Sequence, residues 1–167
     1  MQISAVPKEI NEWSGSVLIA GILEGTIESQ INLFKAIIKD TFLSQRFIDS
    51  KFEGKKNQKL SIELIEGKVK KVIFVGLGKA ETLRIDDLRK AASIGTRQVS
   101  GYERKLGIFF PWDAFDPSSA ACAVGEAVRL SSIKDLRFKS EPKEPTPIDE
   151  VELIGLDTKT TKSAIDE

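Results

Sequence analysis

The sequence predicts an α/β fold, and two observations carry this prediction. Short apolar runs alternate along the chain with amphipathic helical stretches, as in strands joined by crossover helices. The run Val72-Ile73-Phe74-Val75 is continuously apolar, which is typical of a strand buried on both faces of a sheet. A chain of 167 residues is also long enough for one domain with a sizeable core.

The N-terminal part is expected to contain a strand followed by helical structure. Residues 16–23 form an apolar run that ends at Glu24-Gly25, and they are predicted as a buried strand. From residue 26 to about residue 47, apolar side chains recur at steps of three and four residues, which predicts either one long helix or two short ones. Residues 54–57 are expected to form a charged turn.

The middle of the chain is predicted to form a hairpin and a helix. Residues 59–64 alternate between polar and apolar, and a short turn connects them to the apolar run at 72–75. A helix is then expected from about Ile85 to Tyr102. Asp86 and Asp87 would lie in its first turn, where the helix dipole favours negative charge.

The C-terminal part adds two more strands and two helices. Residues 106–110 are predicted as a strand that Pro111 stops, and Ser118 or Ser119 is expected to cap a helix ending near Leu130. A proline-rich, charged stretch at 140–147 predicts an extended linker. Residues 151–156 are predicted as a strand, and residues 159–167 as the start of a helix without a stop signal, which suggests that a longer natural chain continues past Glu167.

Composition excludes several classes of function. Lys plus Arg and Asp plus Glu both number 25, so the chain has no overall charge that would attract nucleic acid or an anionic membrane. The sequence contains no histidine, which removes Ser-His-Asp and Cys-His catalysis and histidine metal sites.

Cys122 is alone and lies on an apolar helix face, so a buried structural role is expected. No apolar run reaches the length of a membrane span and no signal peptide is evident, so a soluble, cytosolic protein is expected.

The turn Gly76-Leu77-Gly78-Lys79 raises the question of a nucleotide site. A P-loop needs glycine five residues before the Gly-Lys pair and Ser or Thr after it, but Ile73 and Ala80 occupy those positions. The dinucleotide fingerprint needs a third glycine, and Glu81 stands there. We therefore interpret the glycines as structural residues that let the chain turn at a strand end.

Two further groups of charged residues are candidate sites. Asp113 and Asp116 lie between a strand and a helix, but a carboxylate pair without companions is typical of turns and caps. The basic clusters could contact nucleic acid, although solvated edges that discourage strand pairing are the favoured interpretation. These clusters comprise Lys55, Lys56, Lys59, Lys68, Lys70 and Lys71.

Several segments taken together resemble the N-terminal domain of the leucyl (cytosol) aminopeptidase family. The strand leading into Gly76-Leu77-Gly78-Lys79 and the helix core Leu88-Arg89-Lys90-Ala91 carry the resemblance, supported by Ala123–Ala127 and Leu136–Ser140. The likeness covers most of residues 1–160. One departure is Arg84-Ile85, where the family usually has Thr-Pro at the start of the helix, and it leaves the N-cap open.

The resemblance implies a macro-domain-like, three-layer sandwich of a mixed β-sheet flanked by helices. It divides the chain into an N-terminal domain at 1–140 and, at 141–167, a linker, a short strand and the start of a helix toward a C-terminal catalytic domain. The family's catalytic motif, Asn-Thr-Asp-Ala-Glu-Gly-Arg, does not occur here. No catalytic, cofactor-binding or metal-binding residue is therefore assigned to this chain, and the chain alone is expected to be inactive.

For the full-length parent, the resemblance implies a homohexameric enzyme that removes N-terminal residues, often leucine, from peptides. Two divalent metals, manganese or zinc, would activate the water in its C-terminal domain. The N-terminal domain would serve assembly and shield the active site. The alternative is a stand-alone macro-like module for an ADP-ribose-type ligand, for which Gly76-Leu77-Gly78 is the only sequence support.

Overall fold

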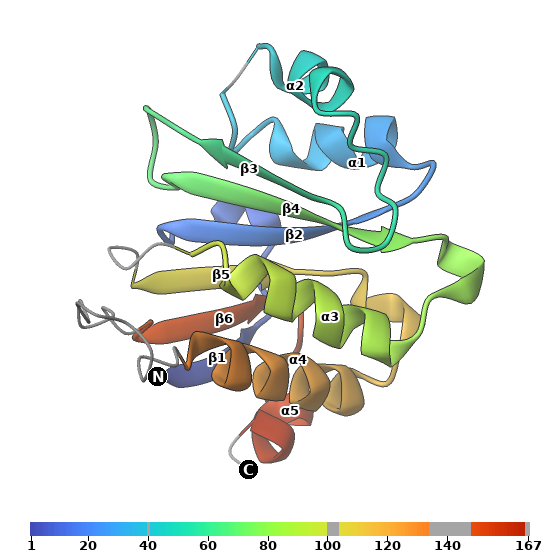
Figure 1. Ribbon diagram of the computed structural model, residues 1–167. Helices are drawn as coiled ribbons and strands as arrows, with labels where there is room; N and C mark the ends of the chain where they lie inside the picture. The colour runs from blue at the N-terminus through green and yellow to red at the C-terminus, as the bar shows by residue number, and fades with distance from the viewer. Residues whose placement is uncertain (40, 100–103, 134–147, 166–167) are drawn as a thin grey trace, which may run out of the picture.

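A computed structural model describes residues 1–39, 41–99, 104–133 and 148–165, and its centre is a six-stranded sheet in the order β1-β6-β5-β2-β4-β3 (Figure 1). The strands are β1 (Gln2–Val6), β2 (Val17–Leu23), β3 (Lys59–Glu63), β4 (Lys71–Gly78), β5 (Lys105–Phe109) and β6 (Glu150–Ile154). The helices are α1 (Ile27–Phe34), α2 (Leu43–Asp49), α3 (Ile85–Thr96), α4 (Pro117–Ser132) and α5 (Thr158–Ile165). Short 3-10 turns are η1 (Ile10–Glu12), η2 (Ala80–Thr82) and η3 (Trp112–Ala114).

The sheet is mixed because one strand runs against the others. β1, β6, β5, β2 and β4 are parallel, whereas β3 pairs antiparallel with β4 at the edge, from Lys59 opposite Val75 to Glu63 opposite Lys71. A short turn can join only antiparallel neighbours, while parallel neighbours need a crossover. The predicted hairpin is therefore confirmed, and the remaining connections cross the faces of the sheet.

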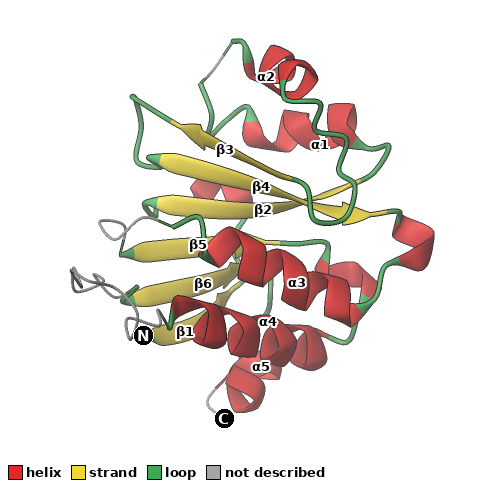
Figure 2. Ribbon diagram, in the orientation of Figure 1, coloured by secondary structure: helices red, strands yellow, loops and turns green. Residues whose placement is uncertain are grey.

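Helices cover both faces of the sheet, so the predicted three-layer α/β sandwich is confirmed (Figure 2). Successive side chains of β2 point to opposite layers, because a strand has a side-chain period of two. Ile19 packs into the core beneath α3, α4 and α5. Leu18 and Ala20 pack into the core beneath α1 and α2. The narrower macro-domain-like label stays a prediction.

The amphipathic stretch from residue 26 to 47 forms two short helices, one of the two alternatives that its sequence left open. α1 ends at Phe34 and α2 begins at Leu43. Phe34, Ile38, Leu43 and Phe47 are all buried in the same core. α2 lies beside α1 (Figure 1), and both helices reach the sheet, because Phe34 of α1 and Phe47 of α2 each contact the ring of Phe74 in β4.

The first and last strands of the chain lie side by side in the sheet. β1 was not predicted, because only Ile3 and Ala5 of its five residues are buried and the apolar signal is short. β6 was predicted as a strand after the linker, and it lies inside the sheet between β1 and β5. The proline-rich stretch at 140–147 and the segment 136–140 fall outside the described residues, and the boundary at residue 140 stays a prediction.

The N-terminus of α4 differs from the prediction. Asp116, rather than Ser118 or Ser119, is the N-cap: its carboxylate accepts from the Ser119 backbone N–H at 2.9 Å and from the Ser119 hydroxyl at 2.8 Å. Pro117 occupies the first helical position, where its missing N–H costs nothing. Asp is as favourable as Ser at an N-cap position. The proline directly after Asp116 makes residue 116 a better N-cap than residue 118 or 119.

Two further helix limits can be compared with the sequence. α3 ends at Thr96, before the predicted limit near residue 102, and residues 100–103 lie outside the described part. α5 occupies Thr158–Ile165, close to the predicted helix start. Within the described ranges, each helix is too short or too polar to cross a lipid bilayer.

Candidate functional site

The carboxyl end of β4, from Gly76 to Gly78, is covered by the backbone of another segment. The Gly76 N–H donates to the Gln58 carbonyl and the Gly78 N–H to the Gly54 carbonyl, both at 2.8 Å. A Cβ on Gly76 would overlap the Lys55 carbonyl oxygen and lie 2.8 Å from the Gly54 carbonyl carbon. Gly78 has a φ of +81°, in the left-handed region that favours glycine. Gly78 ends the strand in the left-handed conformation, in agreement with the predicted turn. Gly76 lies inside β4 rather than in a turn, and glycine is needed there because residues 54–55 approach it closely.

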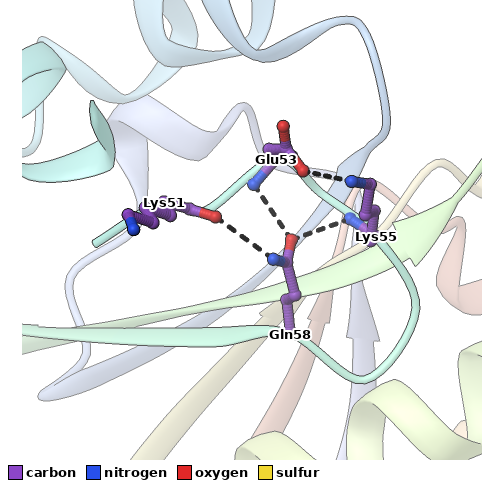
Figure 3. Close-up of polar contacts among 4 residues, drawn as sticks. All are labelled: Lys51, Glu53, Lys55 and Gln58. Atoms are coloured by element: carbon purple, nitrogen blue, oxygen red, sulfur yellow. Dashed lines mark hydrogen bonds and ion pairs between the residues drawn. The ribbon is translucent and has the colours of Figure 1, made fainter. Parts of the chain in front are cut away.

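The covering segment, residues 51–58, is organised by one side chain (Figure 3). The Gln58 Oε1 atom accepts from the backbone N–H groups of Glu53 and Lys55 at 2.9 and 3.0 Å. Its Nε2 atom donates to the Lys51 carbonyl at 3.2 Å. Glu53 and Lys55 also form an ion pair. We call residues 51–58 the Gln58 loop.

An ion pair joins the Gln58 loop to the start of α3. The Lys56 ammonium lies 3.0 Å from the Asp87 carboxylate, which also accepts from the Arg84 backbone N–H at 2.9 Å. Burial by itself would raise the pKa of Asp87, but the Arg84 N–H and the Lys56 ammonium outweigh it and hold this pKa below its ordinary value. Asp87 thus caps α3 as well as complementing the helix dipole.

The carboxyl ends of β2 and β5 are where an α/β sheet commonly binds ligands. α1 follows β2 on one face and α4 follows β5 on the other, which makes this position a topological switch point. Leu77 and Phe110 pack against Gly21 of β2, since a Cβ there would lie 2.7 Å from both side chains. Buried side chains thus occupy this position, next to Trp112, whose indole N–H donates to the Ile154 carbonyl at 2.7 Å.

A hollow of about 750 Å³ lies on the surface between α1 and α2. Its floor is apolar and its rim is charged. An adjoining hollow of about 680 Å³ at the start of α1 shares Ile27, Glu28 and Glu53 with it. Residues of the Gln58 loop form part of the wall of both. One pattern in the sequence marks this feature, the spacing of Glu28, Ile31 and Lys35 on one helical face.

The titratable residues that the sequence singled out do not form a catalytic constellation. Asp116 caps α4, and Asp113 lies in η3 before it. Cys122 is a free thiol and half-buried, less enclosed than expected. In the described part of the chain, no group of three or more His, Cys, Asp or Glu side chains could hold a metal ion. These residues do not fit a two-metal centre, and no catalytic step is assigned to them.

The basic clusters are partly engaged in contacts within the protein. Lys55 pairs with Glu53, Lys56 with Asp87, and the Lys71 ammonium donates to the Gln98 carbonyl at 2.9 Å. Lys59 lies on the edge strand β3, where a charged side chain discourages pairing with another chain. Three of these lysines thus serve contacts within the protein, which supports a structural role for them.

Residues 21–142 match the model of the cytosol aminopeptidase family, N-terminal domain. This chain belongs to that family. A relative named probable cytosol aminopeptidase from Prochlorococcus marinus (strain MIT 9211) is 45% identical over 162 residues, which cover 97% of this chain and 33% of the relative. Its namesake from Synechococcus sp. (strain CC9311) is 32% identical over 169 residues, covering 99% and 33%. The chain thus spans about a third of the length of these cytosol aminopeptidases.

Solved structures show the same fold at low sequence identity. A mutant of tomato leucine aminopeptidase is similar with a TM-score of 0.77 at 21% identity, over 99% of this chain and 35% of that chain. The bottromycin maturation enzyme BotP, in complex with Mn, is similar with a TM-score of 0.58 at 21% identity, over 91% and 28%. Neither the family model nor these relatives support the alternative of a stand-alone module for an ADP-ribose-type ligand.

Proposed function

We propose that this chain is the non-catalytic N-terminal domain of a metal-dependent leucyl aminopeptidase. The observation that carries the proposal is the match of residues 21–142 to the family's N-terminal domain. The curated relatives are about three times as long as the part that matches, so each has room for a separate catalytic domain. In the full-length parent, that domain would hold two divalent metals, manganese or zinc, and hydrolyse N-terminal residues, often leucine, from peptides.

Within the parent, this domain serves assembly and shields the active site. Its partners are the catalytic domain of the same polypeptide and other subunits of a homohexamer in the cytoplasm. Two apolar side chains at the end of α4 support a contact role, since Leu130 and Ile133 are 71% and 73% exposed. Exposed apolar groups that lie close together commonly mark contacts with other parts of an assembly.

Peptidase assays on the chain alone and on the longer protein test this proposal. We expect no release of nitroaniline from leucine p-nitroanilide by the 167-residue chain with added manganese or zinc. The protein extended by the downstream reading frame should turn this substrate over, and a chelator should abolish the activity. Metal-dependent turnover by the chain alone would contradict the domain assignment, as would a stop codon directly after Glu167 in the natural gene.

A further inference from the structure

The hollow between α1 and α2 has an apolar floor, and one exposed apolar side chain stands at its side. Ile31, Phe47 and Phe52 form the floor, and each is at most 5% exposed. Ile48 stands at the side of the same hollow and is 67% exposed. Its volume of about 750 Å³ falls within the usual range for cavities that take small ligands, roughly 300–1,000 Å³.

α1 presents one stripe of side chains to this hollow, with opposite charges at its two ends. Glu28, Ile31 and Lys35 follow at steps of three and four residues, so they share one face of the helix. Seven residues of helix separate Glu28 from Lys35, or about 10.5 Å at 1.5 Å per residue. An extended peptide advances about 3.3–3.6 Å per residue, so three residues match this length.

The two ends of the hollow differ in net charge. Glu24, Glu28 and Glu53 lie around the start of α1, where Lys51 and Lys55 offset two of the three negative charges. Lys35 lies at the opposite end of the α1 stripe. Within the described residues, the side chains of Glu28 and Lys35 make no hydrogen bond or ion pair with the rest of the protein.

The helix dipoles leave this polarity unchanged. α2 runs in the opposite direction to α1 (Figure 1), so the partial charge at each end of one helix opposes that of the other. The charged side chains therefore decide which end of the hollow attracts a cation and which attracts an anion.

The wall of the hollow is held in place before any ligand arrives. Gln58 binds the backbone of Lys51, Glu53 and Lys55 through three hydrogen bonds (Figure 3). Lys56 of the same loop is anchored on Asp87. A wall that is ordered before binding loses little conformational entropy when a ligand binds, and this favours the binding free energy.

We infer that the hollow between α1 and α2 binds a short extended peptide of about three residues with a free ammonium terminus and apolar side chains. The peptide ammonium lies at Glu28, its side chains lie against Ile48 above the floor of the hollow, and its carboxylate lies at Lys35. A fatty acid would match Lys35 but leave Glu28 unpartnered, and a zwitterionic peptide satisfies both ends. Such binding is a property of this chain and does not require the peptidase activity proposed above.

NMR titration of the ¹⁵N-labelled 167-residue chain with the tripeptide Leu-Ala-Leu tests the inference. Saturable shifts are expected in α1, in α2 and at residues 51–55. N-acetylation of the tripeptide and the variant Glu28→Gln should each weaken binding by roughly tenfold, because each removes the charge pair at the ammonium end.

Ile48→Gln should also weaken binding by roughly tenfold, because it removes an apolar contact from the hollow. Ile65→Gln is the matched control, since Ile65 is also exposed but lies between β3 and β4 and does not line the hollow, and it should bind as the original protein does. Four results would overturn the inference: no saturable shift at millimolar peptide, equal affinity for the acetylated peptide, unchanged affinity in Ile48→Gln, or the same shifts produced by protein concentration without peptide, which would indicate a second copy.

Discussion

Replacing Gly76 by alanine tests how closely the Gln58 loop packs on β4. The added methyl group would overlap the Lys55 carbonyl oxygen and approach the Gly54 and Lys55 carbonyl carbons to 2.8 Å. These are backbone atoms, so no side-chain rotation can relieve the overlap. The loop must move away from the strand, which weakens the hydrogen bonds from the Gly76 and Gly78 N–H groups, both 2.8 Å long.

The free energy of unfolding should fall by several kcal/mol. Forcing a methyl group into a packed site costs about 1–3 kcal/mol. Each weakened backbone hydrogen bond adds about 1 kcal/mol. The total of about 3–5 kcal/mol corresponds to a decrease in Tm of roughly 6–20 °C for a domain of this size.

Urea unfolding followed by tryptophan fluorescence measures this change. Both tryptophans are buried, Trp13 at 4% and Trp112 at 6% exposure, so their emission reports the loss of the core. The same substitution at Gly125, in the middle of α4, is the control, because a Cβ there meets only the Ile3 Cδ1 atom at 3.7 Å. Gly125→Ala should stabilise the protein by about 0.5–1 kcal/mol. A Gly76→Ala protein with an unchanged unfolding midpoint would refute the packing described here.

Two further predictions concern single polar contacts. Trp112→Phe should destabilise the protein by about 1–3 kcal/mol in the same assay, because it leaves the buried Ile154 carbonyl without the indole N–H. Trp13→Phe should cost less, since its acceptor Glu152 keeps an ion pair with Lys105 at 3.2 Å, and equal losses would contradict this difference. Because the pKa of Asp87 is lower in the folded protein than in the unfolded chain, its carboxylate stabilises the fold fully above the unfolded value, and this contribution is lost as pH falls through the folded value. Asp87→Asn should therefore lose less stability than the original protein when the pH is lowered through the acidic range, and parallel acid-unfolding curves would exclude a role for this carboxylate.

Elements with a strong local signal could be predicted from the sequence. The continuous apolar runs of β2 and β4 identify buried parallel strands, and alternation in β3 identifies the wet edge strand of the hairpin. The structural role of Gly76 and Gly78 also follows from the failure of both nucleotide patterns. The N-cap of α4 could have been found, because Asp116-Pro117 is itself a helix-start signal.

The candidate binding hollow could not be predicted, because it is made by segments that meet only in three dimensions. Glu28 and Lys35 share a helical face that the sequence shows, but Phe47 and Phe52 come from α2 and the loop after it. The three hydrogen bonds of Gln58 likewise depend on the path of that loop. The backbone groups that Gln58 binds lie three to seven residues before it in the sequence, and no periodic pattern marks these positions.

The sequence by itself determined the α/β class, the two-sided burial of the central strands and the family to which the chain belongs, because each rests on local periodicity or on an ordered set of short motifs. Only the tertiary structure decided the strand order, with β6 between β1 and β5. Only it showed that the backbone at Lys55 is what excludes a side chain at Gly76. A contact between segments that are distant in the sequence produces no periodic pattern in either segment. Such contacts are determined by the packing of the whole chain.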